Sequence, residues 1–325
     1  MKIAIIGGAG FVGNRLSKRL GNANIDHTVF DVNNLKESHQ YVDVTNIESL
    51  NSIKNSDIII NLAAVHRDDI RPISIYDDVN VTGAQNICNV AEKYDIKKII
   101  FTSSVAIYGF APLNTDEDGK PNYFNDYGRT KYLAEQVFKE WQLKDKDNRS
   151  LVIVRPTVIF GEGNRGNVYN LLNQIASKKF LMFGDGKNIK SMAYVENVCA
   201  FLEYSLRLQT GTHIYNYIDK PDLNMNDLVS ISRKKLFNKK GVGLRLPRFL
   251  GVLIGNIFDL LSFLLRRSLP ISSIRVKKFM SNSQFNSSIY KTSFQPPVEL
   301  STGLQKTLNY EFIENNSDKD VFETE

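Results

Sequence analysis

The chain has 325 residues, of which 42% are hydrophobic and 23% charged, and its formal net charge is +6. This length allows a large hydrophobic core, and at about 150 residues per domain it predicts two lobes. Its two cysteines and four histidines follow no metal-binding or redox spacing, so we expect no metal site and a reducing compartment. The opening apolar run, Met1–Ile6, is too short for a signal peptide because Gly7 interrupts it, and we predict a strand there.

A glycine-rich turn follows this strand. Residues Lys2–Ile6 predict a buried parallel strand and Phe11–Leu20 an amphipathic helix, with Gly7, Gly10 and Gly13 between and within them. The first glycine lets the chain reverse, the second lets the backbone approach a pyrophosphate, and the third lets the helix pack closely on the strand. Such a triplet also occurs in ordinary strand-to-helix turns. Its position here predicts a dinucleotide cradle.

The second predicted strand, His27–Phe30, ends at Asp31, about 20 residues past the glycines. A carboxylate there accepts hydrogen bonds from a ribose diol and repels a 2′-phosphate. No Arg or Lys immediately follows Asp31, so the pattern favours NAD. The alternative is that Asp31 merely caps a turn or a helix.

Strand-like and helical stretches alternate along the first half of the chain. Asp57–Leu62, Lys98–Thr102 and Leu151–Val154 are β-rich, and helices such as Val79–Tyr94 lie between them. This alternation predicts an α/β fold with a doubly wound parallel (Rossmann) sheet, in which ligands bind beyond the carboxyl ends of the strands.

The domain organisation follows from this pattern. We expect a Rossmann domain over residues 1–155, with segments near 190–210 returning to it. Residues 156–310 then form mainly a smaller α/β substrate lobe, and 311–325 an acidic flexible tail.

The helix predicted from Tyr127 to Glu140 begins with a chemically useful pair. Tyr127 and Lys131 are four residues apart and therefore lie on one helix face, and Ser104 stands at the end of a neighbouring strand. Tyr titrates near pH 10, so a Tyr base needs its phenolate stabilised by roughly 4 kcal/mol, which an ammonium and a cationic nicotinamide could supply. A Tyr and a Lys also meet by chance on many helices, but the nearby serine favours catalysis on a hydroxyl.

These motifs resemble the extended short-chain dehydrogenase/reductases of the sugar epimerase and dehydratase branch, from Met1 to about Tyr310. In that family the catalytic Ser or Thr stands four residues before a Tyr-Gly pair, which selects Ser104 rather than Ser103. The resemblance implies NAD as cofactor and no metal.

The same resemblance implies roles for residues of this chain. The catalytic residues are Ser104, Tyr127 and Lys131, with Lys131 also clamping a ribose. Asp43 and Val44 flank the adenine, and His66 stands where relatives often place a cofactor-contacting Lys. The complete cofactor set comprises Gly7, Gly10, Phe11, Val12, Gly13, Asp31, Asp43, Val44, Leu62, Ala63, Ala64, His66, Asn80, Tyr127, Lys131 and Pro156.

Departures from the family pattern narrow the reaction. The 4,6-dehydratases carry Asp-Glu directly after the catalytic residue, whereas Val105 and Ala106 stand there in this chain. The resemblance therefore implies epimerisation. Ser104 holds the sugar 4-hydroxyl, Tyr127 removes its proton, hydride passes from C4 to NAD⁺, and after the 4-keto sugar turns over the hydride returns to its other face.

Other departures concern the substrate. Val158 stands where most relatives place an Asn that contacts a sugar nucleotide, and Lys190-Ser191 stand where Arg-Asp is usual. A lysine can face a phosphate as a point charge, without the bidentate fork of arginine. These changes argue against a standard nucleotide sugar.

Basic and apolar residues alternate between residues 233 and 278. Phe249–Leu265 is apolar except at Asn256, Asp259 and Ser262, and it carries basic residues at both ends. Such a helix suits the interface of an anionic membrane, but a core helix with a solvated basic rim fits equally well. Nucleic acid is a weaker third partner, because the segment has few aromatics and no recognisable module.

A closer resemblance favours the membrane. Four stretches resemble the bacterial 4-epimerases that act on N-acetylglucosaminyl-diphospho-undecaprenol: Ala64–Asp69, Arg155–Gly161, Asn164–Asn170 and Tyr217–Asn226. This implies a polyprenol-diphosphate-linked amino sugar as substrate, an anionic membrane surface as partner, and a peripheral location at the cytoplasmic face of the bacterial inner membrane, in surface polysaccharide (O-antigen, lipopolysaccharide) synthesis. The substrate-contact residues that we predict are Ser104, Ala106, Arg165, Asn167, Lys190 and Arg275.

Two alternatives remain from sequence. One is a soluble epimerase of UDP-N-acetylglucosamine, with the same hydride chemistry. The other is a non-catalytic NAD-binding scaffold that recruits a glycosyltransferase, against which the intact Ser104, Tyr127 and Lys131 argue. Epimerases of this branch commonly pair through two helices, here Val79–Tyr94 and Lys131–Gln142, so we expect a homodimer.

Overall fold

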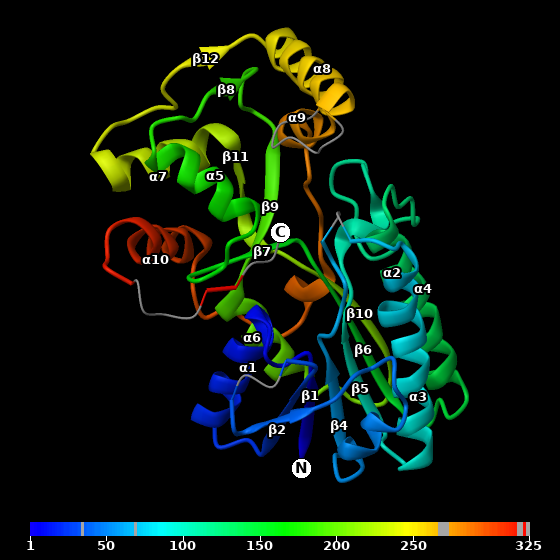
Figure 1. Cartoon of the computed structure of the whole chain (residues 1–325). Coiled ribbons are helices and arrows are strands. Elements are labelled where there is room, and N and C mark those ends of the chain that lie inside the picture. Colours follow the sequence, from blue (N-terminus) through cyan, green and yellow to red (C-terminus); the bar gives the residue numbers. More distant parts are fainter. Residues whose placement is uncertain (34–35, 68–69, 266–272, 317–320, 323–325) are drawn as a thin grey trace.

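The chain forms two stacked lobes (Figure 1). This computed structural model describes residues 1–33, 36–67, 70–265, 273–316 and 321–322. A large parallel sheet with helices on both faces makes the lower lobe, and helices with short strands make the upper lobe.

The large sheet has seven strands in the order β10-β6-β5-β4-β1-β2-β3, and every neighbouring pair is parallel. Its strands are β1 (Ile3–Ile6), β2 (His27–Asp31), β3 (His39–Tyr41), β4 (Ile58–Asn61), β5 (Lys98–Thr102), β6 (Ser150–Pro156) and β10 (Gly211–Tyr217). Apart from the added β10, this is the doubly wound dinucleotide-binding order, and it confirms the predicted fold class. Because β10 belongs to this sheet, the chain returns to it beyond the predicted 190–210 region.

Helices cover both faces of the sheet because both faces are apolar. Ile3 and Ile5 of β1 enter one core cluster, and Ala4 and Ile6 enter the other. The first face is covered by α1 (Phe11–Asn22) and α6 (Val195–Ser205), and the second by α2 (Ser74–Tyr76), α3 (Gly83–Lys93) and α4 (Asp126–Leu143).

One predicted helix differs in the structure. We expected a single helix from Val79 to Tyr94, but its start is a π-helix, η2 (Asp77–Thr82), and α3 begins only at Gly83. Asn80 lies in this wide turn, where its buried side chain forms hydrogen bonds with Val65 and Thr130. π-Turns of this kind often occur at functional sites.

The upper lobe is built around a three-stranded sheet of order β11-β9-β7. The strands of this lobe are β7 (Val158–Phe160), β8 (Met182–Phe183), β9 (Ile189–Tyr194), β11 (Asp219–Asn224) and β12 (Arg245–Leu246). Its helices are α5 (Asn167–Ala176), α7 (Met225–Phe237), α8 (Arg248–Leu265), α9 (Ser273–Met280) and α10 (Leu300–Phe312).

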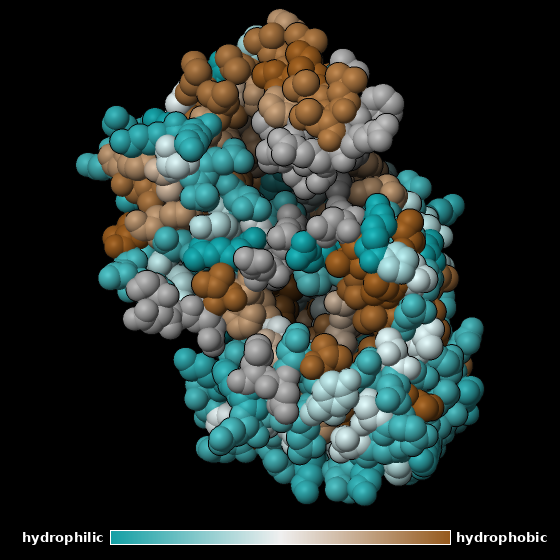
Figure 2. All heavy atoms as spheres, viewed as in Figure 1, coloured by the Kyte–Doolittle hydropathy of each residue, from teal (hydrophilic) through white to brown (hydrophobic). Residues whose placement is uncertain are grey.

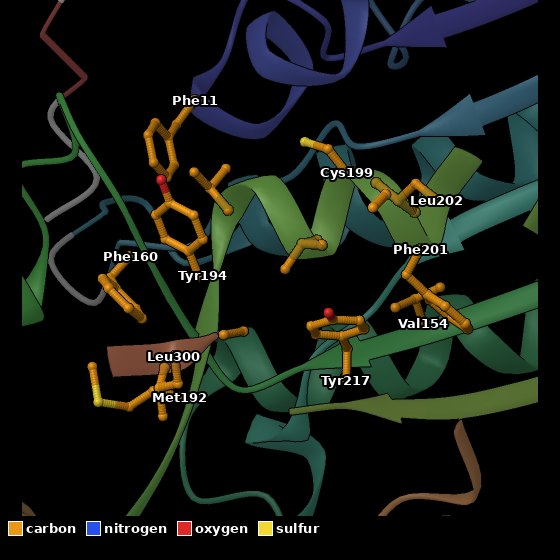
Figure 3. Close-up of a cluster of buried hydrophobic side chains, with 14 of the residues drawn as sticks. Phe11, Val154, Phe160, Met192, Tyr194, Cys199, Phe201, Leu202, Tyr217 and Leu300 are labelled. Carbon is orange, nitrogen blue, oxygen red and sulfur yellow. The ribbon is translucent and has the colours of Figure 1, made fainter. Parts of the chain in front are cut away.

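One hydrophobic cluster runs through both lobes. Figure 3 shows Tyr194 of the upper lobe beside Phe11 of the lower lobe, and the same cluster continues to Phe201 and Val154. The rings of Phe160 and Tyr194 lie 5.6 Å apart. The two lobes therefore share a core, which fixes their relative position at the site between them.

The C-terminal region departs from the flexible tail expected over 311–325. Glu311 belongs to α10, and its side chain accepts a 2.7 Å hydrogen bond from the backbone N–H of Gly163. Further along, the backbone of Phe322 pairs with Gly163 and Arg165 at 2.8 Å each. The Phe322 ring lies 5.8 Å from the ring of Phe11, an apolar contact that acidity of the segment did not predict.

Candidate active site

The glycine loop forms an open cradle at the end of β1. Gly7 has φ +77°, and a Cβ there would lie 2.5 Å from the backbone nitrogen of Ala63. A Cβ on Gly13 would lie 2.5 Å from the Cα of Gly8, so α1 packs directly on the loop. Gly10 is the N-cap residue directly before α1; it is exposed, and no side chain caps the helix there. The first-turn N–H groups of α1 therefore fit a pyrophosphate, as the sequence predicts.

Asp31 lies beside this cradle at the end of β2. Its Oδ2 accepts a 2.9 Å hydrogen bond from the N–H of Ala9, and its Oδ1 accepts a 3.0 Å bond from that of Asn33. The carboxylate thus holds the glycine loop and the following turn, as the cap alternative predicts. Each oxygen keeps a further lone pair, so the position still fits a ribose diol.

A hollow of about 490 Å³ opens next to Asp31, a volume typical of small-molecule sites. Asp43, the predicted adenine neighbour, lies in its wall with Val32 and Thr45. Residues of α2 and η2 form the opposite wall. These walls fit the adenosine half of a dinucleotide whose pyrophosphate sits on the glycine loop.

Asn80 connects this cofactor side to the catalytic helix. Its side chain accepts a 2.9 Å hydrogen bond from the N–H of Val65 and donates one of 3.0 Å to the carbonyl of the same residue. It also donates a 2.9 Å bond to Thr130 of α4. Asn80 therefore holds the loop that follows β4, with Leu62, Ala63 and Ala64, against α4, whereas His66 at the end of that loop is exposed.

The predicted catalytic residues meet at the carboxyl end of β5. A side-chain hydrogen bond joins Ser104 and Tyr127. Ser104 also accepts a 3.1 Å bond from the N–H of Ala106, which begins the turn η3 (Val105–Tyr108). Lys131 lies one turn along α4 from Tyr127, and its Nζ donates a 2.7 Å bond to the carbonyl of Thr102.

Burial shifts the pKa values of both Tyr127 and Lys131. Burial raises the pKa of Tyr127 to about 12, although the hydrogen bond with Ser104 opposes this. Burial also lowers the pKa of Lys131 to about 7, with the carboxylate of Glu135 opposing it. Lowering the pKa of Tyr127 from about 12 to about 7 takes roughly 7 kcal/mol of added stabilisation of the phenolate. This exceeds the roughly 4 kcal/mol expected from the sequence, because burial adds to the task.

A buried polar network behind these residues escaped sequence analysis. Glu135 accepts bonds of 2.8 and 2.6 Å from the guanidinium of Arg155 and one of 2.6 Å from Ser103. Arg155 also donates a 2.6 Å bond to the hydroxyl of Tyr108, which donates to Asn216 at 2.9 Å. The network fixes α4 against β5, β6 and β10. One signal in the sequence could have indicated Glu135: it follows Lys131 by one helical turn and therefore lies on the same face of α4.

Two of the predicted substrate residues have partners within the chain. Arg165 forms an ion pair with Glu311 and stacks 4.1 Å from the ring centre of Tyr169. Lys190 donates a 2.7 Å bond to the carbonyl of Ser281, and burial lowers its pKa to about 8. Asn167 is exposed at the start of α5. The side chain of Arg275 lies outside the described part of the structure.

The apolar helix α8 faces outward. Its side chains Phe249, Leu253 and Ile257 are 67%, 52% and 48% exposed, and Figure 2 shows hydrophobic atoms gathered over α8 at the top of the molecule. Gly251 packs against Phe183, Asp259 accepts the N–H of Ser273 in α9, and Ile254 and Phe258 are partly buried. The exposure of Phe249, Leu253 and Ile257 favours the interfacial interpretation over the core helix. Within the described ranges, no helix has both the length and the hydrophobicity to cross a membrane.

Comparisons with known proteins agree with this architecture. The sequence profile of the NAD dependent epimerase/dehydratase family matches residues 3–217. The chain belongs to this family. It is 46% identical, over 99% of each chain, to the N-acetyl-alpha-D-glucosaminyl-diphospho-ditrans,octacis-undecaprenol 4-epimerase of Escherichia coli O157:H7.

Solved structures of the family share the fold. The UDP-N-acetylglucosamine 4-epimerase of Bacillus cereus superposes with a TM-score of 0.74 at 17% identity, covering 95% of this chain and 98% of that one. The UDP-glucuronic acid 4-epimerase of the same species, solved with NAD, gives 0.70 at 20% identity with the same coverage. The comparisons thus confirm the predicted family, fold class and cofactor, and the resemblance to the lipid-linked 4-epimerases.

Proposed function

We propose that this family member is an isomerase, an NAD-dependent 4-epimerase that interconverts N-acetylglucosaminyl- and N-acetylgalactosaminyl-diphospho-undecaprenol. The observation that carries the chemistry is the position of Tyr127, in the first turn of α4, beside Ser104 at the carboxyl end of β5 and next to the glycine cradle. The lipid-linked substrate is inferred from the name of the E. coli relative, which is similar along the whole chain.

The residues of the chain divide the work on the sugar. Ser104 holds the 4-hydroxyl, and Tyr127 takes its proton and later returns it. NAD bound beside the glycine cradle would supply hydride transfer at C4 and a positive charge near the phenol. Lys131 would orient a ribose hydroxyl of the cofactor and, when protonated, favours the phenolate. Val105 and Ala106 cannot serve as the acid and base that a dehydratase requires.

We further propose that α8 holds the enzyme on the cytoplasmic face of the inner membrane. Its outward side chains are apolar, and Arg245 and Arg248 stand at its start. An amphipathic helix of this kind inserts its apolar face at the headgroup boundary, and each nearby basic residue adds about 1 kcal/mol on an anionic surface.

We also propose that two copies of the chain form a homodimer through α3 and α4. Sedimentation equilibrium would test this oligomeric state.

A side-by-side assay tests the substrate. The purified enzyme is given UDP-N-acetylglucosamine or N-acetylglucosaminyl-diphospho-undecaprenol, and the C4 configuration of each product is resolved. Conversion of the lipid-linked sugar supports the proposal. Conversion of the UDP-sugar alone would assign a soluble epimerase, and conversion of neither would favour the scaffold alternative.

Vesicle flotation tests the membrane contact. The triple change Phe249→Ser, Leu253→Ser, Ile257→Ser should reduce binding to anionic vesicles without unfolding the protein, since these side chains are exposed. The control is Tyr41→Ser, which removes a 54% exposed side chain at the β3 edge of the large sheet. Undiminished flotation of the triple variant would contradict the role of α8.

A further inference from the structure

A second exposed apolar group lies on the lower lobe, close to the catalytic residues. We call Phe110, Tyr123 and Phe124 the aromatic rim; they are 42%, 41% and 45% exposed. The rings of Phe110 and Phe124 stack with centres 5.1 Å apart. Grouped exposed aromatics usually mark a binding surface. None of the three rim residues has a role in the proposed reaction on the sugar.

The rim is attached rigidly to the catalytic turn. Gly109 has φ +60°, and a Cβ there would lie 2.1 Å from the carbonyl of Asn122, so the two rim segments touch through their backbones. A Cβ on Gly128 would lie 2.6 Å from the carbonyl of Ala106 and 3.0 Å from the Cβ of Tyr123. The rim therefore keeps a fixed position relative to Ser104 and Tyr127, which flank these contacts in sequence.

The rim also meets the upper lobe. The ammonium of Lys277, in α9, lies 5.3 Å from the ring centre of Phe110. Helix α9 packs on the inner side of α8, where Asp259 accepts the N–H of Ser273. Figure 2 shows one hydrophobic area over α8 and another near the upper ends of α2 and α4. The two areas thus belong to opposite lobes, and Lys277 of the upper lobe contacts Phe110 of the lower lobe.

We propose that the aromatic rim binds the first isoprene units of the polyprenol chain of the substrate. This inference rests on the proposed function. Only one sugar ring and two phosphates separate the reacting C4 from the lipid, so the chain must begin a short distance from Ser104 and Tyr127. The rim is the exposed apolar surface fixed to that turn. Lys277 beside it supplies a positive charge suited to the neighbouring diphosphate.

The occupant follows from this pairing of charge and apolar surface. A diphosphate joined to a hydrocarbon chain presents two negative groups and then an apolar segment, which matches Lys277 followed by Phe110 and Phe124. Another copy of this chain is the competing occupant, and the experiment below separates the two.

The test measures how the rate depends on lipid length. N-acetylglucosaminyl diphosphates carrying a single isoprene unit, a short prenyl chain or the full undecaprenyl chain are compared in one detergent, with wild type and the double variant Phe110→Ser/Phe124→Ser. In wild type, KM should fall as the first units are added. In the variant this gain should shrink by about tenfold, because the buried apolar area is lost. The single-unit substrate, which reaches the least of the rim, should show the smallest difference between the two enzymes.

Controls keep the outcomes distinct. Tyr41→Ser should keep the wild-type dependence on chain length, and circular dichroism verifies that the variants fold. An unchanged dependence in the double variant overturns the rim proposal while leaving the epimerase proposal standing. A change of sedimentation from dimer to monomer would assign the rim to subunit contact and also overturn it. Failure of wild type to convert any lipid-linked sugar overturns both proposals.

Discussion

The two lobes differ in which side chains they bury and which they expose. In the lower lobe, charged groups such as Glu135 and Arg155 are buried and fully paired, and large apolar side chains fill the core. In the upper lobe, α8 turns Gly251 and Asp259 inward and Phe249 and Leu253 outward. The lower lobe thus buries and pairs its charged groups, whereas the upper lobe leaves large apolar side chains of α8 exposed, as the proposed membrane contact requires.

Helices α1 and α8 make the contrast concrete. Helix α1 buries Phe11, Leu16 and Leu20 against the sheet, as an amphipathic helix of a globular protein does. Helix α8 instead buries Gly251 and Gly255 and exposes Phe249, Leu253 and Ile257. Hydrophobic periodicity predicts a two-faced helix in both cases, and only the packing of neighbouring elements shows which face is covered.

The largest effect should come from Tyr127→Phe. Removing the phenolic hydroxyl eliminates the proton acceptor, so kcat should fall about 10³-fold, roughly 4 kcal/mol in the barrier. NAD binding, followed by fluorescence, and thermal stability should stay near wild type, which would confine the function of this residue to the chemistry. The matched control is Tyr41→Phe, a change at an exposed tyrosine on the β3 edge of the large sheet, whose activity should persist. Activity in Tyr127→Phe above about a tenth of wild type would remove the tyrosine from the reaction.

Next in size is the loss of the buried ion pair in Glu135→Gln. The guanidinium of Arg155 would stay buried without its carboxylate, which should lower the free energy of unfolding by about 3 kcal/mol. Denaturant titration measures this, with the exposed Glu140→Gln on the same helix as control. The double change Glu135→Leu/Arg155→Met should recover most of the loss. A cost near zero for the single change would mean that the lower lobe does not depend on its paired charges.

How much the sequence predicts also differs between the lobes. The glycines, Asp31 and Ser104 follow strand ends and Tyr127 lies in the first turn of α4, where local patterns predict them. Glu135 and Arg155 meet only because α4 lies across β6, a contact between residues far apart in the chain. Sequence therefore predicts the catalytic positions and misses the residues that support them.

The upper lobe was harder to predict for a related reason. Arg165 and Lys190 were assigned to the substrate by charge and resemblance, and the structure gives each a partner within the chain, Glu311 and the carbonyl of Ser281. Charge alone does not reveal such long-range partners. Phe322 likewise packs on Phe11 from a segment whose acidity suggested a free tail.

An effect of similar size, on the pH dependence of the free energy of unfolding, is expected for Lys131→Met. At pH 6 the lysine is protonated in both the folded and unfolded chain, so folding buries an ammonium; at pH 9 the folded chain, with the pKa lowered to about 7, has released that proton. The cost of burial therefore falls as pH rises from about 7 toward 10. Lys131→Met, which removes this cost, should stabilise the protein more at pH 6 than at pH 9, by about 3 kcal/mol. Equal gains at both pH values would contradict the lowered pKa, and activity should be lost throughout.

The smallest effect tests whether the charges of the upper lobe reach the substrate. Glu311 now pairs with Arg165 and would repel a diphosphate bound to that arginine. Glu311→Gln keeps an oxygen for the N–H of Gly163 but removes the negative charge. If Arg165 contacts the diphosphate, KM for the lipid-linked sugar should fall two- to threefold, about 0.5 kcal/mol, with kcat unchanged. Glu314→Gln, a change of the same charge just beyond α10, serves as control. An unchanged KM in Glu311→Gln would make the Arg165 ion pair purely structural, and the upper lobe would then resemble the lower one in its use of charge.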